Sequence, residues 1–326
     1  MLIVNGIAGN IRAVTVKSIF IRINLIMNIG FAIYKQIIMQ NIKLFIELTR
    51  LNKPIGYMLL FWPCLWGLTI SYDFNSDLNI FFTYGILFLI GAILMRSAGC
   101  IVNDIADKQF DKKVSRTKNR PIASEKISVK LAIIYVLVLC SIAFLVLINF
   151  NKFTILMALL STPLAFTYPL MKRFTYWPQL FLGITFNYGL VLAWISIKNE
   201  VSLVPILFYF GAIFWTLGYD TIYGYQDIKD DEIIGIKSTS IKFKENPKKF
   251  ILICYTFFLA SLILIGMLMS FNIIYFMLLI LPMYQLFYYQ LNKIEIDNPK
   301  SCLEKFKTNN FLGLIVFLNI FIGKIL

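Results

Sequence analysis

The chain alternates between long apolar runs and short polar segments that are rich in lysine and arginine. About 20 apolar residues are needed for a helix to cross the hydrocarbon core of a bilayer, and nine runs reach or approach that length. The predicted spans are 55–72, 80–100, 131–149, 152–170, 179–197, 201–222, 251–269, 272–291 and 309–325. The pattern therefore predicts an all-α integral membrane protein with nine transmembrane helices.

Composition and charge agree with this interpretation. Hydrophobic residues make up 59% of the 326 positions, and the mean hydropathy is +0.76. The net charge of +14 would also suit a nucleic-acid-binding protein. However, the basic residues gather in the N-terminal arm and after the second, fourth, sixth and eighth spans, as the positive-inside rule requires of a membrane protein. We therefore expect the lipid bilayer and no nucleic acid as a partner, and we expect these loops to face the cytoplasm.

The use of histidine and cysteine limits the general bases, metal sites and disulfides that the chain can contain. The chain has no histidine, which removes the most common general base and transition-metal ligand. Its five cysteines lie far apart and include no Cys-x-x-Cys pair, which argues against a disulfide framework or a zinc site.

Residues 1–45 are predicted to form a basic N-terminal extension, and residues 46–326 the nine-helix domain. The extension is compatible with a targeting segment, an interfacial amphipathic helix or an over-long start. It is rich in isoleucine and poor in serine for a mitochondrial transit peptide, so we favour a bacterial inner membrane over a mitochondrial one. The sequence identifies no protein partner.

Two acidic clusters follow the second and sixth spans. In the first, Asn103, Asp107 and Asp111 are spaced four residues apart, with Asp104 beside them. In a helix these side chains would share one face. In the second, Asp227 and Asp231 are spaced four apart, with Asp230 between them and with Asp220 and Tyr223 on the predicted continuation of the same face. Four spans separate the clusters, so both lie on the same side of the membrane. The pattern therefore predicts two four-helix halves plus a ninth helix around a central cavity.

The side chains of these clusters favour magnesium bound to a polyanion. Mg²⁺ prefers oxygen ligands and is usually held by one or two carboxylates together with substrate phosphates and water. One ion is predicted on Asn103 with Asp107, and another on Asp227 with Asp231. Two such ions would clamp a diphosphate. Candidate basic contacts are Arg116, Arg120, Lys172, Arg173 and Lys237. Arg96, inside the second span, is a further candidate because charges within the membrane are usually functional.

A cation-coupled transporter is the alternative from another class, and it predicts carboxylates near the middle of the spans. Here the acids gather at one surface instead. A single loop aspartate is most often only solvated, and a single loop lysine or arginine most often only sets topology. Two dense clusters at matching positions favour a functional site.

The two clusters also resemble known motifs. NDIADKQFD with the downstream RTKNRP is similar to the first aspartate motif of the UbiA family of intramembrane prenyltransferases, and YDTIYGYQDIKDD with GIKSTS to the second. RLNKPIGYMLLFWPCLWGL, YPLMKRFTYWPQLFLGITFNYG and CLEKFKTNNFLG extend the resemblance from about residue 45 to the end. The KPIG, YPLMKR and GIKSTS stretches resemble the branch that prenylates 4-hydroxybenzoate.

This resemblance implies Mg²⁺-dependent transfer of a polyprenyl group from polyprenyl diphosphate to 4-hydroxybenzoate, in ubiquinone synthesis. The ring would attack through the carbon ortho to its hydroxyl, and its proton would pass to a site carboxylate or to diphosphate. Arg50 and Arg173 are candidates to hold the benzoate carboxylate, and Tyr223 is a further substrate-binding candidate. The metal ligands would be Asn103, Asp107, Asp227 and Asp231, supported by Asp104, Asp111 and Asp230.

Three related activities are the nearest alternatives. A menaquinone-branch enzyme would prenylate a dihydroxynaphthoate. A haem-farnesylating enzyme is disfavoured because the chain lacks histidine. A soluble prenyl-chain synthase also uses aspartate-rich metal motifs, but nine apolar spans argue against it.

Overall fold

The computed structural model describes residues 27–28, 31 and 34–326. The chain divides into two compact units, Met1–Glu47 and Leu48–Leu326. Most of the predicted 1–45 extension lies outside the described residues, and residues 34–47, which are described, are helical.

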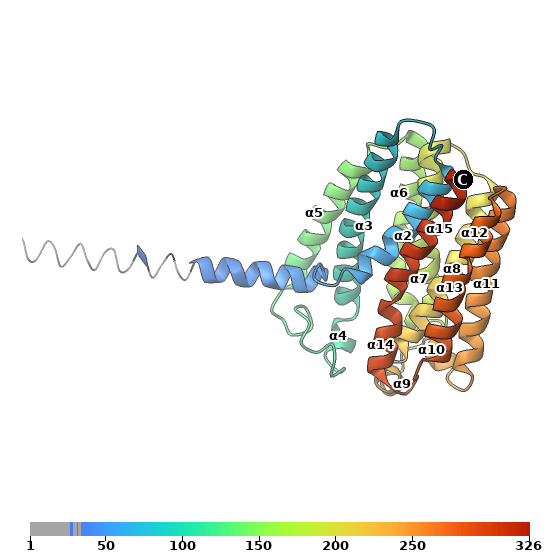
Figure 1. The fold of residues 1–326 in the computed structure, drawn as a ribbon. Coiled ribbons are helices and arrows are strands. Elements are labelled where there is room, and N and C mark those ends of the chain that lie inside the picture. The colour runs from blue at the N-terminus through green and yellow to red at the C-terminus, as the bar shows by residue number, and fades with distance from the viewer. Residues whose placement is uncertain (1–26, 29–30, 32–33) are drawn as a thin grey trace, which may run out of the picture. The chain divides into compact units, whose positions relative to one another are not determined.

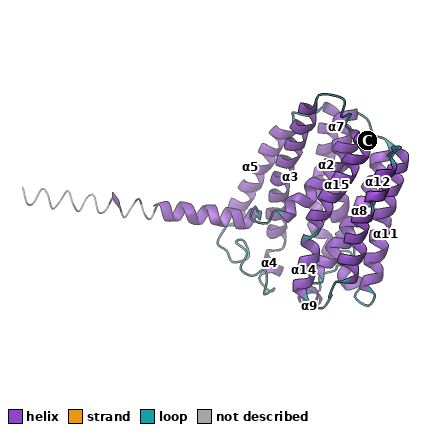
Figure 2. Ribbon diagram, viewed as in Figure 1, coloured by secondary structure: helices purple, strands orange, loops and turns teal. Residues whose placement is uncertain are grey.

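Leu48–Leu326 is built from helices, and no strand occurs among the residues that the structure describes (Figure 2). Eight described helical segments are long and apolar enough to cross a membrane, and the 17-residue α2 is a shorter apolar helix. Each of the nine predicted spans corresponds to one of these segments. They are α2 (Ile55–Ser71), α3 (Leu78–Ala106), α5 (Val129–Leu147), α6 (Lys152–Thr167) with the 3₁₀ helix Tyr168–Arg173, α7 (Pro178–Lys198), α8 (Leu203–Gly224), α11 (Pro247–Leu268), α12 (Ile273–Leu278) with α13 (Ile280–Met283) and the π-helix Tyr284–Asn292, and α14 (Pro299–Lys307) with α15 (Asn309–Ile325).

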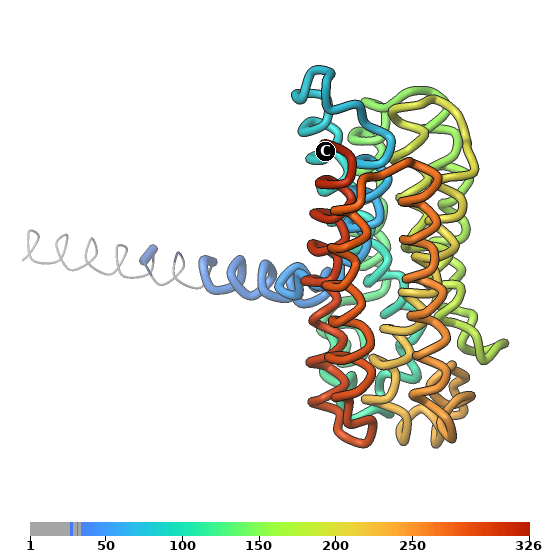
Figure 3. The backbone as a smooth tube through the Cα atoms, turned by 45° about the vertical axis from the view of Figure 1, so that its right-hand side comes forward, coloured from blue at the N-terminus to red at the C-terminus, as the bar shows by residue number. Residues whose placement is uncertain are grey.

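Three short helices lie in the loops: α4 (Lys108–Asp111), α9 (Ile228–Ile234) and α10 (Thr239–Lys242). Within this unit, α4, α9 and α10 lie at one end of the bundle (Figure 1). The connection between α2 and α3 and the C-terminus lie at the other end in both views (Figures 1 and 3). The two acidic clusters therefore reach the same end of the bundle, as the even number of intervening spans predicts.

An aromatic core holds the spans together. The fully buried Trp66 of α2 packs against Phe208 and Trp215 of α8, with ring centroids 5.5 and 5.0 Å apart. Its indole nitrogen donates to the backbone oxygen of Gly313 in α15 at 3.0 Å. The last helix is thereby fixed to the first span, because a buried indole N–H needs an acceptor in a membrane interior.

The crossing of α2 and α7 depends on a glycine. A Cβ atom at Gly67 would lie 2.1 Å from the backbone oxygen of Leu190. Only a residue without a side chain allows the two backbones to approach this closely. This contact places α7 against α2, and α7 contributes to the cavity described below.

Candidate active site

The first acidic cluster forms where α3 ends. Asp107 is the C-cap of α3, and α4 continues for one turn to Asp111. Asp104, Asp107 and Asp111 are all buried. Buried carboxylates need cationic or hydrogen-bonding partners, since desolvation of a charge is costly. The loop that follows α4 supplies such a partner.

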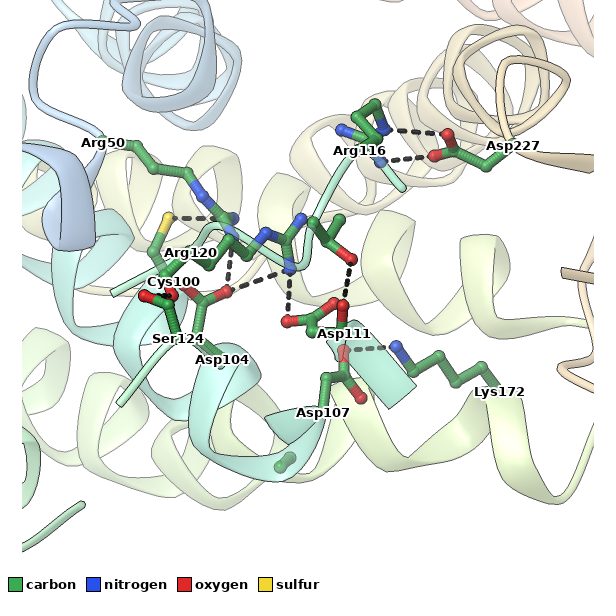
Figure 4. A network of polar contacts seen from close by, with 12 residues as sticks. Arg50, Cys100, Asp104, Asp107, Asp111, Arg116, Arg120, Ser124, Lys172 and Asp227 are labelled. Atoms are coloured by element: carbon green, nitrogen blue, oxygen red, sulfur yellow. Dashed lines mark hydrogen bonds and ion pairs between the residues drawn. The ribbon is translucent and has the colours of Figure 1, made fainter. Parts of the chain in front are cut away.

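Two arginines hold the inner part of this cluster (Figure 4). Arg50 Nη2 donates to Asp104 Oδ1 at 2.5 Å. Arg120 Nη1 donates to the same Asp104 oxygen at 3.2 Å and to Asp111 Oδ2 at 2.8 Å. The segment before α2 and the loop after α4 are therefore tied to the end of α3.

The 3₁₀ helix brings two more bases to the same place. Lys172 Nζ donates to Asp107 Oδ2 (Figure 4), whereas Asp107 Oδ1 is buried and has no hydrogen-bond partner in the described part of the chain. Burial raises the pKa of the Asp107 carboxyl, and the Lys172 ammonium opposes that shift. Arg173 Nη2 donates to the backbone oxygen of Ala106 at 2.5 Å.

The second cluster is joined to the first half by Arg116. Its Nε donates to Asp227 Oδ1 at 2.8 Å, and its Nη2 donates to Asp227 Oδ2 (Figure 4). Its Nη1 lies 3.4 Å from the Tyr223 hydroxyl. Burial and the neighbouring Asp227 carboxylate raise the pKa of Asp231 to about 6.

The predicted continuous helical face in the second motif is wrong. Helix α8 ends at Gly224, and α9 begins after Asp227, so Asp220 and Tyr223 lie on a different helix from Asp231. The interruption lets Asp227 turn toward Arg116. A spacing pattern alone does not reveal such a turn.

The remaining predicted residues lie around these two clusters. The backbone N–H of Lys237 donates to the Lys172 carbonyl at 2.9 Å, and Lys237 Nζ donates to the Phe174 carbonyl at 3.3 Å. Among the described residues, the side chains of Asn103, Asp230 and Asp231 have no hydrogen-bond or ion-pair partner.

An apolar cavity of about 340 Å³ lies next to the first cluster, toward the middle of α3, and is lined by α2, α3, α5, α6 and α7. Phe88, Phe144 and Leu159 are among its apolar lining residues, and Arg96 and Tyr168 line it toward the cluster end of their helices. The sequence predicted a central cavity enclosed by both halves, whereas this cavity is lined by the four spans of the first half and by α7 of the second. The first residue of the YPLMKR motif, Tyr168, was the available signal for its polar side.

Arg96 is the most unusual base at this cavity. Its Nε is buried without a hydrogen-bond partner among the described residues, and its guanidinium carbon lies 5.5 Å from the centre of the Phe186 ring. A Cβ atom on Gly56 would lie 3.0 Å from Nε, so the glycine leaves room for the guanidinium. No described carboxylate forms an ion pair with it. A cation without an ion-pair partner inside a membrane protein is typical of a ligand-binding position.

The carboxylates suit a hard divalent cation. No group of three or more His, Cys, Asp or Glu in the described residues is arranged to hold a metal on its own. However, Asp107 retains a buried oxygen without a partner, and the Asp231 carboxylate forms no ion pair with a described residue. Mg²⁺ commonly takes only one or two protein carboxylates and completes its shell with phosphate oxygens and water. The donor set therefore fits magnesium bound together with a polyphosphate.

Comparisons with known proteins identify relatives of this chain. The model of the UbiA prenyltransferase family matches residues 60–318. The chain is 41% identical over 281 residues to the mitochondrial 4-hydroxybenzoate polyprenyltransferase of Caenorhabditis elegans, covering 86% of this chain and 78% of the relative. It is 40% identical over 281 residues to the 4-hydroxybenzoate octaprenyltransferase of Vibrio atlanticus, covering 86% of this chain and 97% of the relative.

Solved structures share the fold at lower sequence identity. The apo structure of a UbiA homolog from Aeropyrum pernix K1 has a TM-score of 0.65 and 23% identity, over 82% of this chain and 96% of that one. A UbiA homolog from Archaeoglobus fulgidus bound to DMAPP and Mg²⁺ has a TM-score of 0.64 and 17% identity, over 85% and 98% of the two chains.

Proposed function

This chain belongs to the UbiA prenyltransferase family, and we propose that it transfers a polyprenyl group from polyprenyl diphosphate to the ring of 4-hydroxybenzoate. The observation that carries the proposal is the position of two acidic and basic clusters at one end of the bundle, next to an apolar cavity. A diphosphate suits the clusters, and an isoprenoid chain suits the cavity. The relatives named for this reaction support the choice of acceptor.

The clusters would bind the diphosphate with Mg²⁺. Asn103 with Asp107 would hold one ion, and Asp227 with Asp231 a second. Bound there, magnesium would stabilise the negative charge that grows on the departing diphosphate. Lys172 and Arg116 now occupy oxygens of Asp107 and Asp227. We propose that these two side chains turn to the phosphate oxygens when the ions and the diphosphate bind.

The apolar cavity would hold the polyprenyl chain out of water. When the carbon–oxygen bond to diphosphate breaks, an allylic cation remains at the first carbon of the chain. The rings of Phe186 and Tyr168 line the cavity near Arg96, and aromatic faces stabilise a nearby cation. Exclusion of water protects that cation from hydrolysis.

Arg96 is the best-placed group to bind the carboxylate of 4-hydroxybenzoate. Arg50 is bonded to Asp104, and Arg173 to the carbonyl of Ala106, so both earlier candidates are engaged. Arg96 lies eight residues before Asp104, which is about 12 Å along the helix and places it below the clusters, beside the cavity. A guanidinium can bind a carboxylate through two parallel hydrogen bonds.

The chain is a multi-pass membrane protein, and we propose that its acidic loops face the cytoplasm of a bacterium. The charge asymmetry of the loops supports this orientation. The similar proteins include mitochondrial and bacterial forms. The composition of the N-terminal arm favours the bacterial inner membrane over the mitochondrial one.

A product assay tests the function. Membranes that contain the chain receive labelled 4-hydroxybenzoate and a polyprenyl diphosphate, with Mg²⁺ or with a chelator. We expect a labelled, lipid-extractable product only with Mg²⁺. Product from a dihydroxynaphthoate but not from 4-hydroxybenzoate would move the chain to the menaquinone branch. Cation flux without product from any aromatic acceptor would favour a transporter and overturn the proposal.

A further inference from the structure

The Asp220 carboxylate forms no ion pair with the lysines and arginines of the two clusters. It lies one turn before the end of α8, within the membrane-spanning part of the helix, and is partly buried. None of the described residues gives its side chain a hydrogen bond or an ion pair. In contrast, Asp104, Asp107 and Asp227 are each bonded to a lysine or arginine. An unpaired carboxylate at this depth is costly and is typical of a functional position.

The surroundings of Asp220 point to the acceptor site. Arg96 is the charged group that interacts electrostatically with Asp220, and the Tyr168 hydroxyl interacts with both. Arg96 and Tyr168 line the apolar cavity. Arg96 Nε on α3 is buried without a hydrogen-bond partner among the described residues, and the Asp220 carboxylate on α8 has no such partner either. Unsatisfied polar atoms from α3 and α8 therefore border the same region, which suits a polar, aromatic ligand.

We propose that Asp220 is the base that removes the ring proton of the aromatic acceptor, an inference that rests on the proposed function. Asp220 can accept a proton because it forms no ion pair with a described lysine or arginine, and the chain contains no histidine to act instead. With the acceptor carboxylate on Arg96, the ring would lie between Arg96 and the clusters.

The step balances in atoms and electrons. The ring carbon ortho to the hydroxyl forms a bond to the first carbon of the polyprenyl group, while the bond from that carbon to diphosphate oxygen breaks and diphosphate keeps its electron pair. The cationic ring then loses the proton from the substituted carbon to the Asp220 carboxylate, which becomes a carboxylic acid, and the ring regains its aromaticity. This proton is strongly acidic, so a carboxylate is a sufficient base. The Asp220 proton then passes to water, and the carboxylate is restored.

The test uses the full-length protein in membranes and 4-hydroxybenzoate deuterated at both positions ortho to the hydroxyl. Asp220→Asn should lower kcat by about 10²- to 10⁴-fold, the usual contribution of a general base, with the Kd for polyprenyl diphosphate unchanged. Proton loss should become rate-limiting, so the ratio of rates for light and deuterated acceptor should rise from near one to clearly above one. Asp220→Glu should keep more activity than Asp220→Asn and show the isotope effect on its remaining rate. Asp297→Asn, in the loop before α14, is the matched control and should behave as wild type.

The outcomes separate the two proposals. If wild-type protein forms no prenylated 4-hydroxybenzoate, the proposed function fails. If wild type is active and Asp220→Asn matches it, the role of Asp220 fails alone. A slow Asp220→Asn or Asp220→Glu variant with an isotope effect of one would also overturn it, because loss of structure alone slows the reaction without making proton loss rate-limiting.

Discussion

Replacing Arg96 with alanine should weaken binding of the acceptor rather than of the diphosphate. The guanidinium lies beside the cavity, its Nε has no hydrogen-bond partner among the described residues, and no described carboxylate forms an ion pair with it. The variant would remove the group that we assign to the carboxylate of 4-hydroxybenzoate. It would leave Lys172 and Arg116, the bases bonded to the metal-binding carboxylates, in place.

The size of the effect follows from the burial of Arg96. Truncating one partner of a buried, hydrogen-bonded charge pair costs about 2–5 kcal/mol. Arg96 is only partly buried, so the lower part of this range, about 2–3 kcal/mol, applies. At about 1.4 kcal/mol per factor of ten, the KM for 4-hydroxybenzoate should rise roughly 30- to 150-fold. The KM for polyprenyl diphosphate should stay within about twofold of wild type.

The assay measures both KM values on membranes, with 4-hydroxybenzoate and with the uncharged 4-hydroxybenzamide. Wild type should prefer the acid, and Arg96→Ala should lose that preference because the charge that recognises the carboxylate is gone. Arg96→Lys should recover only part of it, since an ammonium lacks the planar fork of a guanidinium. Lys293→Ala, which removes a base that packs on Tyr288, is the control. A raised KM for the diphosphate with an unchanged KM for the acid would refute this assignment.

Three further predictions concern the clusters and the N-terminal arm. Asp107→Asn and Asp227→Asn should each lower turnover by about 10²-fold or more while the protein stays folded in the membrane, as size-exclusion chromatography would report; a near-normal rate in either would contradict the two-metal proposal. Arg116→Ala should raise the KM for polyprenyl diphosphate roughly fivefold, equivalent to about 1 kcal/mol, because its pair with Asp227 is partly exposed; an unchanged KM would show that Arg116 does not reach the phosphates. Deleting residues 2–26 should leave the specific activity of the membranes intact, and complete loss would show that the arm contributes to the site or to targeting.

The spans were predictable because each is a local apolar run whose length is fixed by the bilayer. The predicted spans 55–72 and 179–197 correspond to Ile55–Ser71 and Pro178–Lys198. The predicted span 309–325 matches α15 (Asn309–Ile325), but the pattern did not predict α14 (Pro299–Lys307), which directly precedes it. The polar face of α14, which includes Lys300 and Lys307, hides it from a search for apolar runs.

The composition of the two clusters was predictable, but their pairing was not. Spacing suggested that neighbouring acids share a helical face, whereas the partners of those acids come from distant segments. Arg50 is 54 residues from Asp104, and Arg116 is 111 residues from Asp227. Such contacts depend on how the helices pack, and apolar periodicity does not specify that packing. The sequence singled out Arg96 by its place within a span, but not its lack of an ion pair, which depends on the same packing.

The most direct test of the central claim is a single-turnover experiment on purified protein, with polyprenyl diphosphate, ring-labelled 4-hydroxybenzoate and Mg²⁺. Diphosphate release and prenylated ring are measured together, and the position of the new carbon–carbon bond is determined by NMR. The account predicts one diphosphate released for each ring prenylated, with the new bond at the carbon ortho to the hydroxyl, and neither product when the metal is chelated. Diphosphate release without a prenylated ring, or a prenylated ring formed equally well under chelation, would contradict it.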